Sequence, residues 1–399
     1  MKISQIYNAT AKTVFNICIF FLLINIFLFV VFAIKDSFFQ IKKSNPIAKK
    51  YNDPSLKKVY PQLNVEAIND LIIETWSRPY IYEPFTLFKE RPYKGHYVNV
   101  SKNGFRITKN QGPWPPVLNN INIFLFGGST TFGYGVPDDQ TIASYLQEFL
   151  SNRLRREVRV YNFGRGSYYS TQERILFERL LVSGIIPDLA VFIDGFNDIY
   201  LLNDKPAFSD YFEQVSFAKK KEKTTVSLVL KLMDKLPITR LAKLYLYNLG
   251  IFKKTETKDQ IDQNNLEFDE QKYIDQSKIT DVINRYLENK KIIEALADVY
   301  AVKAVFVWHP IPSYKYDVSY HLFFKFGLID DYLRVGYFFM ERLVRNTFLG
   351  ENFLWTADIQ ENLERPLYVD KVHYSAEMSE ILAVHIGKLL LERNFLMEN

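Results

Sequence analysis

The sequence is short of cysteine and histidine: its 399 residues contain one cysteine, Cys18, and five histidines. A single cysteine cannot form an intrachain disulfide and excludes a metal site built from several thiolates. The formal net charge is only +5, and the densest basic run, Lys219 to Lys223, is short. So small a charge gives no electrostatic footprint for DNA or RNA. We therefore expect no metal, no cofactor and no nucleic-acid partner.

The sequence does contain a long apolar run from Val14 to Ile34, in which only Asn16 and Asn25 are polar. A membrane-spanning helix needs about 20 such residues, whereas a signal peptide has a shorter apolar region and small residues at its cleavage site. The stretch ending at Ala33 is a poor cleavage site. We predict an uncleaved transmembrane anchor within residues 1–35, with a cleaved signal as the alternative.

The orientation of this anchor is not set by charge, because lysines flank the apolar run on both sides. A short N-terminal tail before a large domain is typical of an anchor whose N-terminus stays in the cytoplasm. We therefore expect a single-pass protein whose main domain is periplasmic or extracellular.

Residues 36–118 are predicted to form a stalk and an N-terminal extension. Their first part is rich in lysine and contains three prolines within "KKSNPIAKKYNDPSLKKVYPQLN". Apolar spacing over 65–77 predicts one helix. The segment 97–110 predicts a short hairpin with Asn103-Gly104 at its turn, and "GPWPPV" at 112–117 is a linker.

From residue 119 to 399 strand-like and helix-like segments alternate. Strands are expected at 121–126, 158–163, 189–193, 304–310 and 353–356, and helices at 141–153, 170–183, 283–300 and 375–392. This order predicts an α/β domain with a parallel sheet covered by helices on both faces. Residues 201–280 interrupt this alternation and are predicted to be an insertion. The insertion is expected to be a lid, a membrane-facing helix pair, or helices packed on the core.

Polar residues follow several of the expected strands, where a parallel sheet builds its site. Ser129 comes after two glycines at the end of the first strand, and a serine needs a base to become a nucleophile. His373 lies three residues after Asp370, a spacing that lets the carboxylate orient the imidazole. His309 ends a strand but has no nearby carboxylate in sequence. Asn197, in "GFND", and the "GRGS" turn offer donors for an oxyanion.

The four segments "FGGST", "NFGRGSYYS", "DGFND" and "VDKVHYS" resemble, in order and spacing, the sequence blocks of the SGNH, or GDSL, hydrolases. The resemblance covers about residues 120–395. It implies a three-layer flavodoxin-like sandwich, with Ser129 as nucleophile, His373 as base and Asp370 as the residue that orients it. It also implies an oxyanion hole made by the amide of Ser129, an amide of the second block and the side chain of Asn197.

Two positions depart from the family pattern. Gly128 replaces the aspartate before the serine, as it does in many relatives. Ser167 stands where the second block usually has its oxyanion glycine, with Gly166 just before it. Serine adopts positive φ less easily than glycine, so the neighbouring Gly166 is an alternative to Ser167 here. We expect one of these two residues to supply the second-block amide of the oxyanion hole.

Other interpretations of the serine turn are weaker. A phosphate-binding loop requires a lysine where this sequence has Tyr134, after Gly128 and Gly133. A turn with a capping serine explains Ser129 but not Asp370 and His373. We predict a serine-dependent ester hydrolase acting on an acyl ester of a cell-surface glycan or lipid. The alternatives are an O-acyltransferase acting on an extracellular polysaccharide and a non-catalytic, membrane-anchored binding protein on the same fold.

Overall fold

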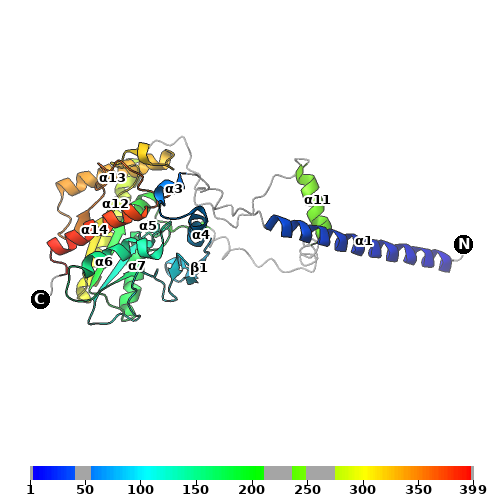
Figure 1. The fold of residues 1–399 in the computed structure, drawn as a ribbon, viewed down its shortest axis with the longest axis horizontal. Helices are drawn as coiled ribbons and strands as arrows, with labels where there is room; N and C mark the ends of the chain where they lie inside the picture. The colour runs from blue at the N-terminus through cyan, green and yellow to red at the C-terminus, as the bar shows by residue number, and fades with distance from the viewer. Residues whose placement is uncertain (1–2, 41–54, 211–235, 249–274, 397–399) are drawn as a thin grey trace. The chain divides into compact units, whose positions relative to one another are not determined.

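The structure, a computed structural model, describes residues 3–40, 55–210, 236–248 and 275–396 (Figure 1). The chain divides into two compact units. One comprises Met1–Pro46 and Asp210–Glu267, and the other comprises Ile47–Ser209 and Phe268–Asn399. Parts of the predicted stalk and most of the predicted insertion lie outside the described residues.

The first unit contains the N-terminal helix α1 (Ile3–Gln40) and helix α11 (Pro237–Asn248). In α1, the 31 residues Ile3–Ala33 are long and apolar enough to cross a membrane, and they are mostly exposed. An N-terminal signal sequence has the same two properties. The two helices touch where the backbone N–H of Ile238 donates to Asn25 Oδ1 at 3.2 Å.

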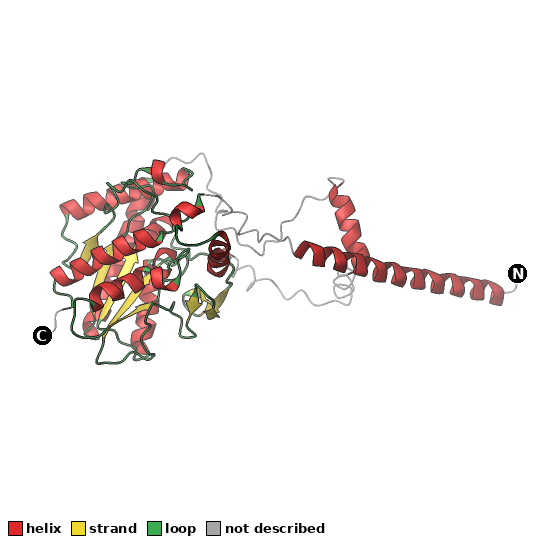
Figure 2. Cartoon of the chain, in the orientation of Figure 1, coloured by secondary structure: helices red, strands yellow, loops and turns green. Residues whose placement is uncertain are grey.

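The second unit is built on a five-stranded sheet. Its strands are β5 (Ile121–Gly127), β6 (Val158–Asn162), β7 (Leu189–Asp194), β8 (Lys303–Trp308) and β9 (Phe353–Trp355). They run parallel in the order β6-β5-β7-β8-β9, which is the flavodoxin-like order. Helices cover the sheet (Figure 2). The predicted α/β fold is confirmed.

The two faces of the sheet differ because side chains alternate along each strand. On one face, aliphatic residues pack against α6 (Ile142–Ser151) and α14 (Ala376–Glu392). On the other, Phe126, Phe192 and Phe306 lie in register on three neighbouring strands and stack on one another. Helix α7 (Ser170–Val182) adds Phe177 to this aromatic row, and α12 (Gln276–Val299) places Lys290 over its end. Both faces are therefore buried, as parallel sheets require.

The residues before the sheet are ordered elements of the same unit: α3 (Leu56–Val59), α4 (Val65–Trp76), β1 (Tyr80–Glu83), β2 (Leu87–Glu90), β3 (Tyr93–Lys94) and β4 (Asn99–Val100). Buried Leu71, Ile72 and Val98 form one apolar core with Phe132, Tyr134 and Val369. This extension therefore packs against the segments that follow β5 and precede α14.

The predicted hairpin within 97–110 is present, because the backbone N–H of Gly104 donates to Ser101 O at 3.0 Å and that of Ile107 donates to Asn99 O at 2.9 Å. Its first strand, β4, also pairs with β3. Two local features differ from the sequence prediction. The β1–β2 hairpin was not predicted; its tip holds Phe85 and Leu87 at positive φ, without the usual glycine or asparagine. Helix α13 (Leu328–Asn346) was also missed, and its internal Gly336 lets Ile199 of α8 (Phe196–Tyr200) approach closely.

Candidate active site

The serine turn follows β5 directly. Gly127 ends the strand, and Ser129 begins the one-turn helix α5 (Ser129–Phe132). A Cβ at Gly128 would lie 2.3 Å from the side-chain nitrogen of Asn197, so any larger residue here would displace that amide. The N–H of Ser129 is at the first position of α5, where a helix supplies no acceptor. The turn therefore presents both a hydroxyl and an unused amide.

A tight loop before α14 carries Asp370 and His373. The carboxylate oxygen Oδ1 of Asp370 accepts hydrogen bonds from the backbone N–H of Val372 at 2.9 Å and of His373 at 2.8 Å. Its other oxygen, Oδ2, lies 2.7 Å from His373 Nδ1. These three contacts fix the carboxylate and, through it, the plane of the imidazole ring.

Ser129, His373 and Asp370 form one hydrogen-bonded chain, because His373 Nε2 lies 2.8 Å from Ser129 Oγ. An ionised carboxylate only accepts hydrogen bonds, so Nδ1 carries the proton and Nε2 accepts from the serine hydroxyl. Burial opposes ionisation of Asp370, but the neighbouring His373 and the hydrogen bonds it receives outweigh this effect and lower its pKa to about 2. The carboxylate therefore stays ionised at all but very acidic pH.

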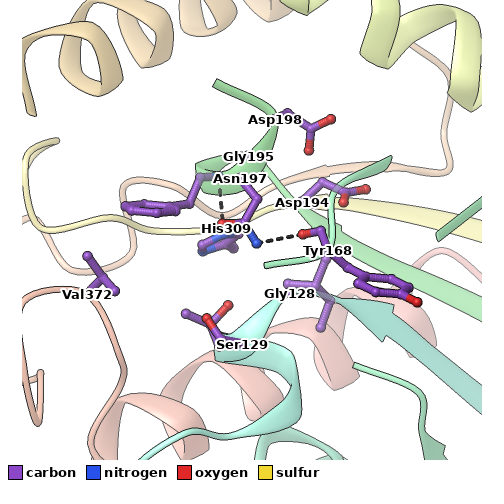
Figure 3. A pocket seen from close by; sticks show the side chains of 12 residues that line it. Gly128, Ser129, Tyr168, Asp194, Gly195, Asn197, Asp198, His309 and Val372 are labelled. Atoms are coloured by element: carbon purple, nitrogen blue, oxygen red, sulfur yellow. Dashed lines mark hydrogen bonds between the residues drawn. The ribbon is translucent and has the colours of Figure 1, made fainter. Parts of the chain in front are cut away.

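Asn197 faces the same turn from the first residues of α8 (Figure 3). Its side-chain amide donates to the backbone carbonyl of Tyr168 at 2.6 Å, which leaves the second amide hydrogen for a ligand. A small pocket lies here, lined by Gly128, Ser129, Asn197, His309 and Val372 among others. It has about 10 Å³ of room for solvent, roughly that of one water molecule.

Replacing Asn197 with alanine tests whether this amide stabilises an oxyanion. We expect Asn197→Ala to lower kcat on a soluble ester by roughly 10²-fold or more, because one well-placed donor contributes about 3 kcal/mol to such a transition state. Asn346→Ala, on the exposed side of α13, is the control and should leave kcat unchanged. A wild-type rate in Asn197→Ala would show that another donor serves the oxyanion.

The structure separates the two candidates in the second block. Ser167 adopts a left-handed backbone with φ of 59°, the conformation that favours glycine. The N–H of Gly166 donates to Glu90 Oε1 at 3.2 Å, whereas that of Ser167 has no acceptor among the described residues. Neither residue lines the pocket. Of the two, Ser167 has the amide that is still available to a ligand.

His309 is a pocket residue for which the sequence offered no partner. Its Nε2 accepts a hydrogen bond from the backbone N–H of Phe196 at 3.5 Å, so the ring proton is on Nδ1. Nδ1 lies 2.9 Å from Pro310 O and 2.5 Å from Tyr374 Oη. Burial lowers the pKa of His309 to about 4. A neutral imidazole therefore lies beside Asn197. The end of β8 was the only sequence signal for this placement.

The remaining histidines lie outside the pocket. His321 is buried against Tyr368, with ring centroids 4.9 Å apart, and burial lowers its pKa to about 4. His385 is half-buried on α14, and His96 is exposed. His373 is thus the only described histidine that contacts Ser129.

Three buried carboxyl groups lie together at the pocket: Asp194 and Asp198 are among its lining residues, and Glu173 lies beside them. Both oxygens of Glu173 and of Asp194 lack a hydrogen-bond donor in the described part of the chain. Burial, together with the neighbouring acids, raises the pKa of Glu173 and of Asp194 well above the usual range. No group of His, Cys, Asp or Glu among the described residues is arranged to hold a metal ion. The group therefore retains protons in the folded state.

This retained protonation predicts how stability depends on pH. A carboxyl whose folded pKa is raised releases its proton on unfolding, so stability is lost as pH rises above the ordinary pKa of about 4.3. Each retained proton lowers the unfolding free energy by about 1.4 kcal/mol per pH unit. We expect Glu173→Gln, whose amide can donate to Asp194, to flatten this decline between pH 5 and 8 in chemical denaturation. Glu148→Gln, on the surface, is the control. Equal slopes in Glu173→Gln and wild type would contradict the prediction.

No protein-family model and no curated protein matches the sequence. Solved structures do match. A member of the lipolytic protein G-D-S-L family from Veillonella parvula is 11% identical, with a TM-score of 0.34, and the alignment covers 68% of this chain and 96% of that one. A catalytic mutant of an acetylxylan esterase from Geobacillus stearothermophilus is 15% identical, with a TM-score of 0.35 and coverage of 71% and 97%. A lipase from a goat rumen metagenome is 11% identical, with a TM-score of 0.37 and coverage of 69% and 98%.

These matches are distant in both sequence and structure. At this level of similarity they say nothing about individual residues or about substrate. The function is therefore inferred below from the contacts of the site itself.

Proposed function

We propose that this protein is a serine-dependent esterase that removes an acyl group through an acyl-enzyme intermediate. The observation that carries the proposal is the hydrogen-bonded chain from Ser129 to His373 to Asp370, with distances of 2.8 and 2.7 Å. A serine hydroxyl bonded to an imidazole that is itself oriented by a buried carboxylate is the arrangement that activates a serine for attack.

In the first half of the reaction, Ser129 Oγ attacks the ester carbonyl carbon as its proton moves to His373 Nε2. Asp370, ionised throughout, stabilises the resulting imidazolium. The negative charge that forms on the carbonyl oxygen is met by the amide of Ser129, the free amide hydrogen of Asn197 and the amide of Ser167. The intermediate then expels the alcohol, which takes the proton from His373, and leaves the acyl group on Ser129.

In the second half, water enters and gives a proton to His373 as its oxygen attacks the acyl-enzyme. Collapse of this second intermediate releases the carboxylic acid and returns the proton to Ser129. The buried ring of His373 contacts Trp76, with centroids 5.9 Å apart, and Tyr134, at 5.4 Å, and these two rings also contact each other. These contacts hold the base in place for both halves of the cycle.

The size of the pocket favours a short acyl group. Its solvent space of about 10 Å³ matches one water molecule, so a small group fits inside it and a longer chain would extend beyond it. We therefore place acetyl or a similarly short acyl ester first among substrates, with the alcohol supplied by a cell-surface glycan or lipid.

A substrate screen tests the proposal. Full-length protein in detergent should hydrolyse p-nitrophenyl acetate faster than the butyrate and octanoate esters, and a fluorophosphonate probe should label Ser129. Labelling without release of p-nitrophenol would contradict hydrolysis and favour transfer to another acceptor. Absence of both would contradict the nucleophile assignment.

The location proposed for this activity is the outer side of a membrane, with α1 as the anchor. The length and apolarity of Ile3–Ala33 support this placement. A tag fused after the C-terminus should be accessible to an impermeant protease in intact cells or spheroplasts. Accessibility only after the membrane is permeabilised would contradict the orientation.

A further inference from the structure

We infer that Glu90, at the end of the β1–β2 hairpin, is a positioning residue for both halves of the site. The inference rests on the proposed function. Glu90 is buried, and it comes from a part of the chain that carries no recognised motif. Its carboxylate bonds two groups, Gly166 and Tyr134, each of which is one step from the reacting atoms.

The first of these groups is the oxyanion loop. Glu90 Oε1 accepts the backbone N–H of Gly166 at 3.2 Å, and the next residue, Ser167, holds the left-handed conformation and the unused amide. A Cβ at Gly166 would lie 2.1 Å from the hydroxyl of Tyr80, so the loop lies directly against the hairpin. Because Glu90 binds the Gly166 amide, it determines which peptide of this loop remains free.

The second group is the ring that packs on the base. Tyr134 donates its hydroxyl to the same oxygen, Glu90 Oε1, at 2.7 Å. The ring of Tyr134 stacks on the imidazole of His373, with centroids 5.4 Å apart and planes 28° from parallel. Glu90 therefore restrains Tyr134, and Tyr134 covers one face of the His373 ring, whereas the bonds to Asp370 and Ser129 lie in the ring plane.

The charge of Glu90 is held by one buried cation. Arg78 Nη1 donates to Glu90 Oε2 at 2.9 Å, and both side chains are almost fully covered. Arg78 is itself fixed by the carbonyls at the end of α4, through Glu74 O at 2.7 Å and Thr75 O at 3.0 Å. Because Arg78 binds Oε2 of Glu90, Oε1 is left to accept hydrogen bonds from Gly166 and Tyr134. These contacts form a continuous chain from α4 through Arg78 and Glu90. From Glu90 one branch reaches the loop of Gly166, and the other reaches Tyr134, whose ring packs on His373.

The structure supplies a matched control in the same hairpin. Glu83 is also buried and forms ion pairs with Lys89 and Arg179 at the end of β1. Loss of its charge removes two ionic contacts from the hairpin and the electrostatic attraction of Arg165, but no hydrogen bond of Gly166 or Tyr134. A general weakening of the hairpin would affect both variants, whereas a positioning role belongs to Glu90 alone.

The test compares Glu90→Gln, Glu83→Gln and wild type in full-length protein with p-nitrophenyl acetate. We expect Glu90→Gln to lower kcat at least about 10-fold with KM within about 2-fold, because displacements of about 1 Å near a reaction centre cost up to roughly 10²-fold. The rate of fluorophosphonate labelling should fall with kcat. Glu83→Gln should retain both rates, even if its melting temperature falls as far as that of Glu90→Gln.

Two outcomes would overturn the inference: a folded Glu90→Gln with wild-type kcat, or an equal loss of kcat in Glu83→Gln. If Glu90→Gln does not fold, Tyr134→Phe replaces it, since this variant keeps the ring and the Arg78–Glu90 pair and removes the hydroxyl that bonds Glu90 and Tyr80. It should lower kcat several-fold with KM unchanged, and a wild-type kcat would equally contradict the inference. A wild-type protein that neither hydrolyses the ester nor reacts with the probe would instead contradict the proposed function.

Discussion

Ser129→Ala should abolish ester hydrolysis, with kcat reduced by roughly 10⁶-fold, because loss of the nucleophile removes the covalent route altogether. The change deletes one hydroxyl whose hydrogen bond is to His373, so the fold should be retained. The measurement is release of p-nitrophenol under conditions that give measurable wild-type turnover, together with fluorophosphonate labelling, which should disappear.

The control for this variant is Ser183→Ala. Ser183 caps the end of α7, and its hydroxyl donates to the carbonyl of Arg179, far along the helix from the pocket. It should leave both readouts unchanged. Turnover near the wild-type level in Ser129→Ala would remove the serine from the mechanism and leave the fold without an assigned nucleophile.

Asp370→Asn should lower kcat by roughly 10⁴-fold with little change in structure. In the wild-type protein the ionised carboxylate accepts the proton of His373 Nδ1 at 2.7 Å. An asparagine amide at this position can donate to Nδ1, which shifts the ring proton to Nε2, and a protonated Nε2 cannot accept the serine proton. The measurement is kcat across pH 6 to 9, where the loss should persist.

Asp330→Asn is the matched control for the loss of a nearby buried carboxylate. Asp330 pairs with Lys371 at 2.9 Å and accepts the N–H of Gly327, but does not bond His373. It should retain kcat to within a few-fold. Similar losses of kcat in the two variants would contradict the prediction. They would mean that removing any nearby negative charge lowers kcat, and that the tautomer of His373 is not the cause.

The sheet was predictable because its pattern is local. Each of the five expected strands is present within a few residues of its predicted bounds, since short apolar runs such as 121–126 are followed by glycine, proline or polar turns. The proposed triad was also accessible from sequence. Asp370 and His373 are three residues apart, and Ser129 follows a strand whose carboxyl end must face the site.

What the sequence did not reveal depends on contacts between distant segments. Phe85 and Leu87 adopt positive φ in the β1–β2 hairpin without glycine or asparagine, so Pro84 is its one strong turn signal. Glu90 reads as one more charged residue in a polar stretch, and its bond to Gly166 spans 76 positions. His309 gains its place in the pocket only through Phe196 and Tyr374, which the fold brings together.

The distance in sequence between the serine and its base has a consequence for biosynthesis. Ser129 and His373 are 244 residues apart, and at 5 to 20 residues per second a ribosome needs roughly 10 to 50 s to add that length. Throughout this interval the nascent chain carries the hydroxyl without the imidazole. The sheet strands β5, β6 and β7 are made before β8, β9 and the loop of Asp370 and His373. The chain therefore cannot hold its hydrogen-bonded triad until that loop has been made, so the proposed site stays incomplete over this whole stretch of translation.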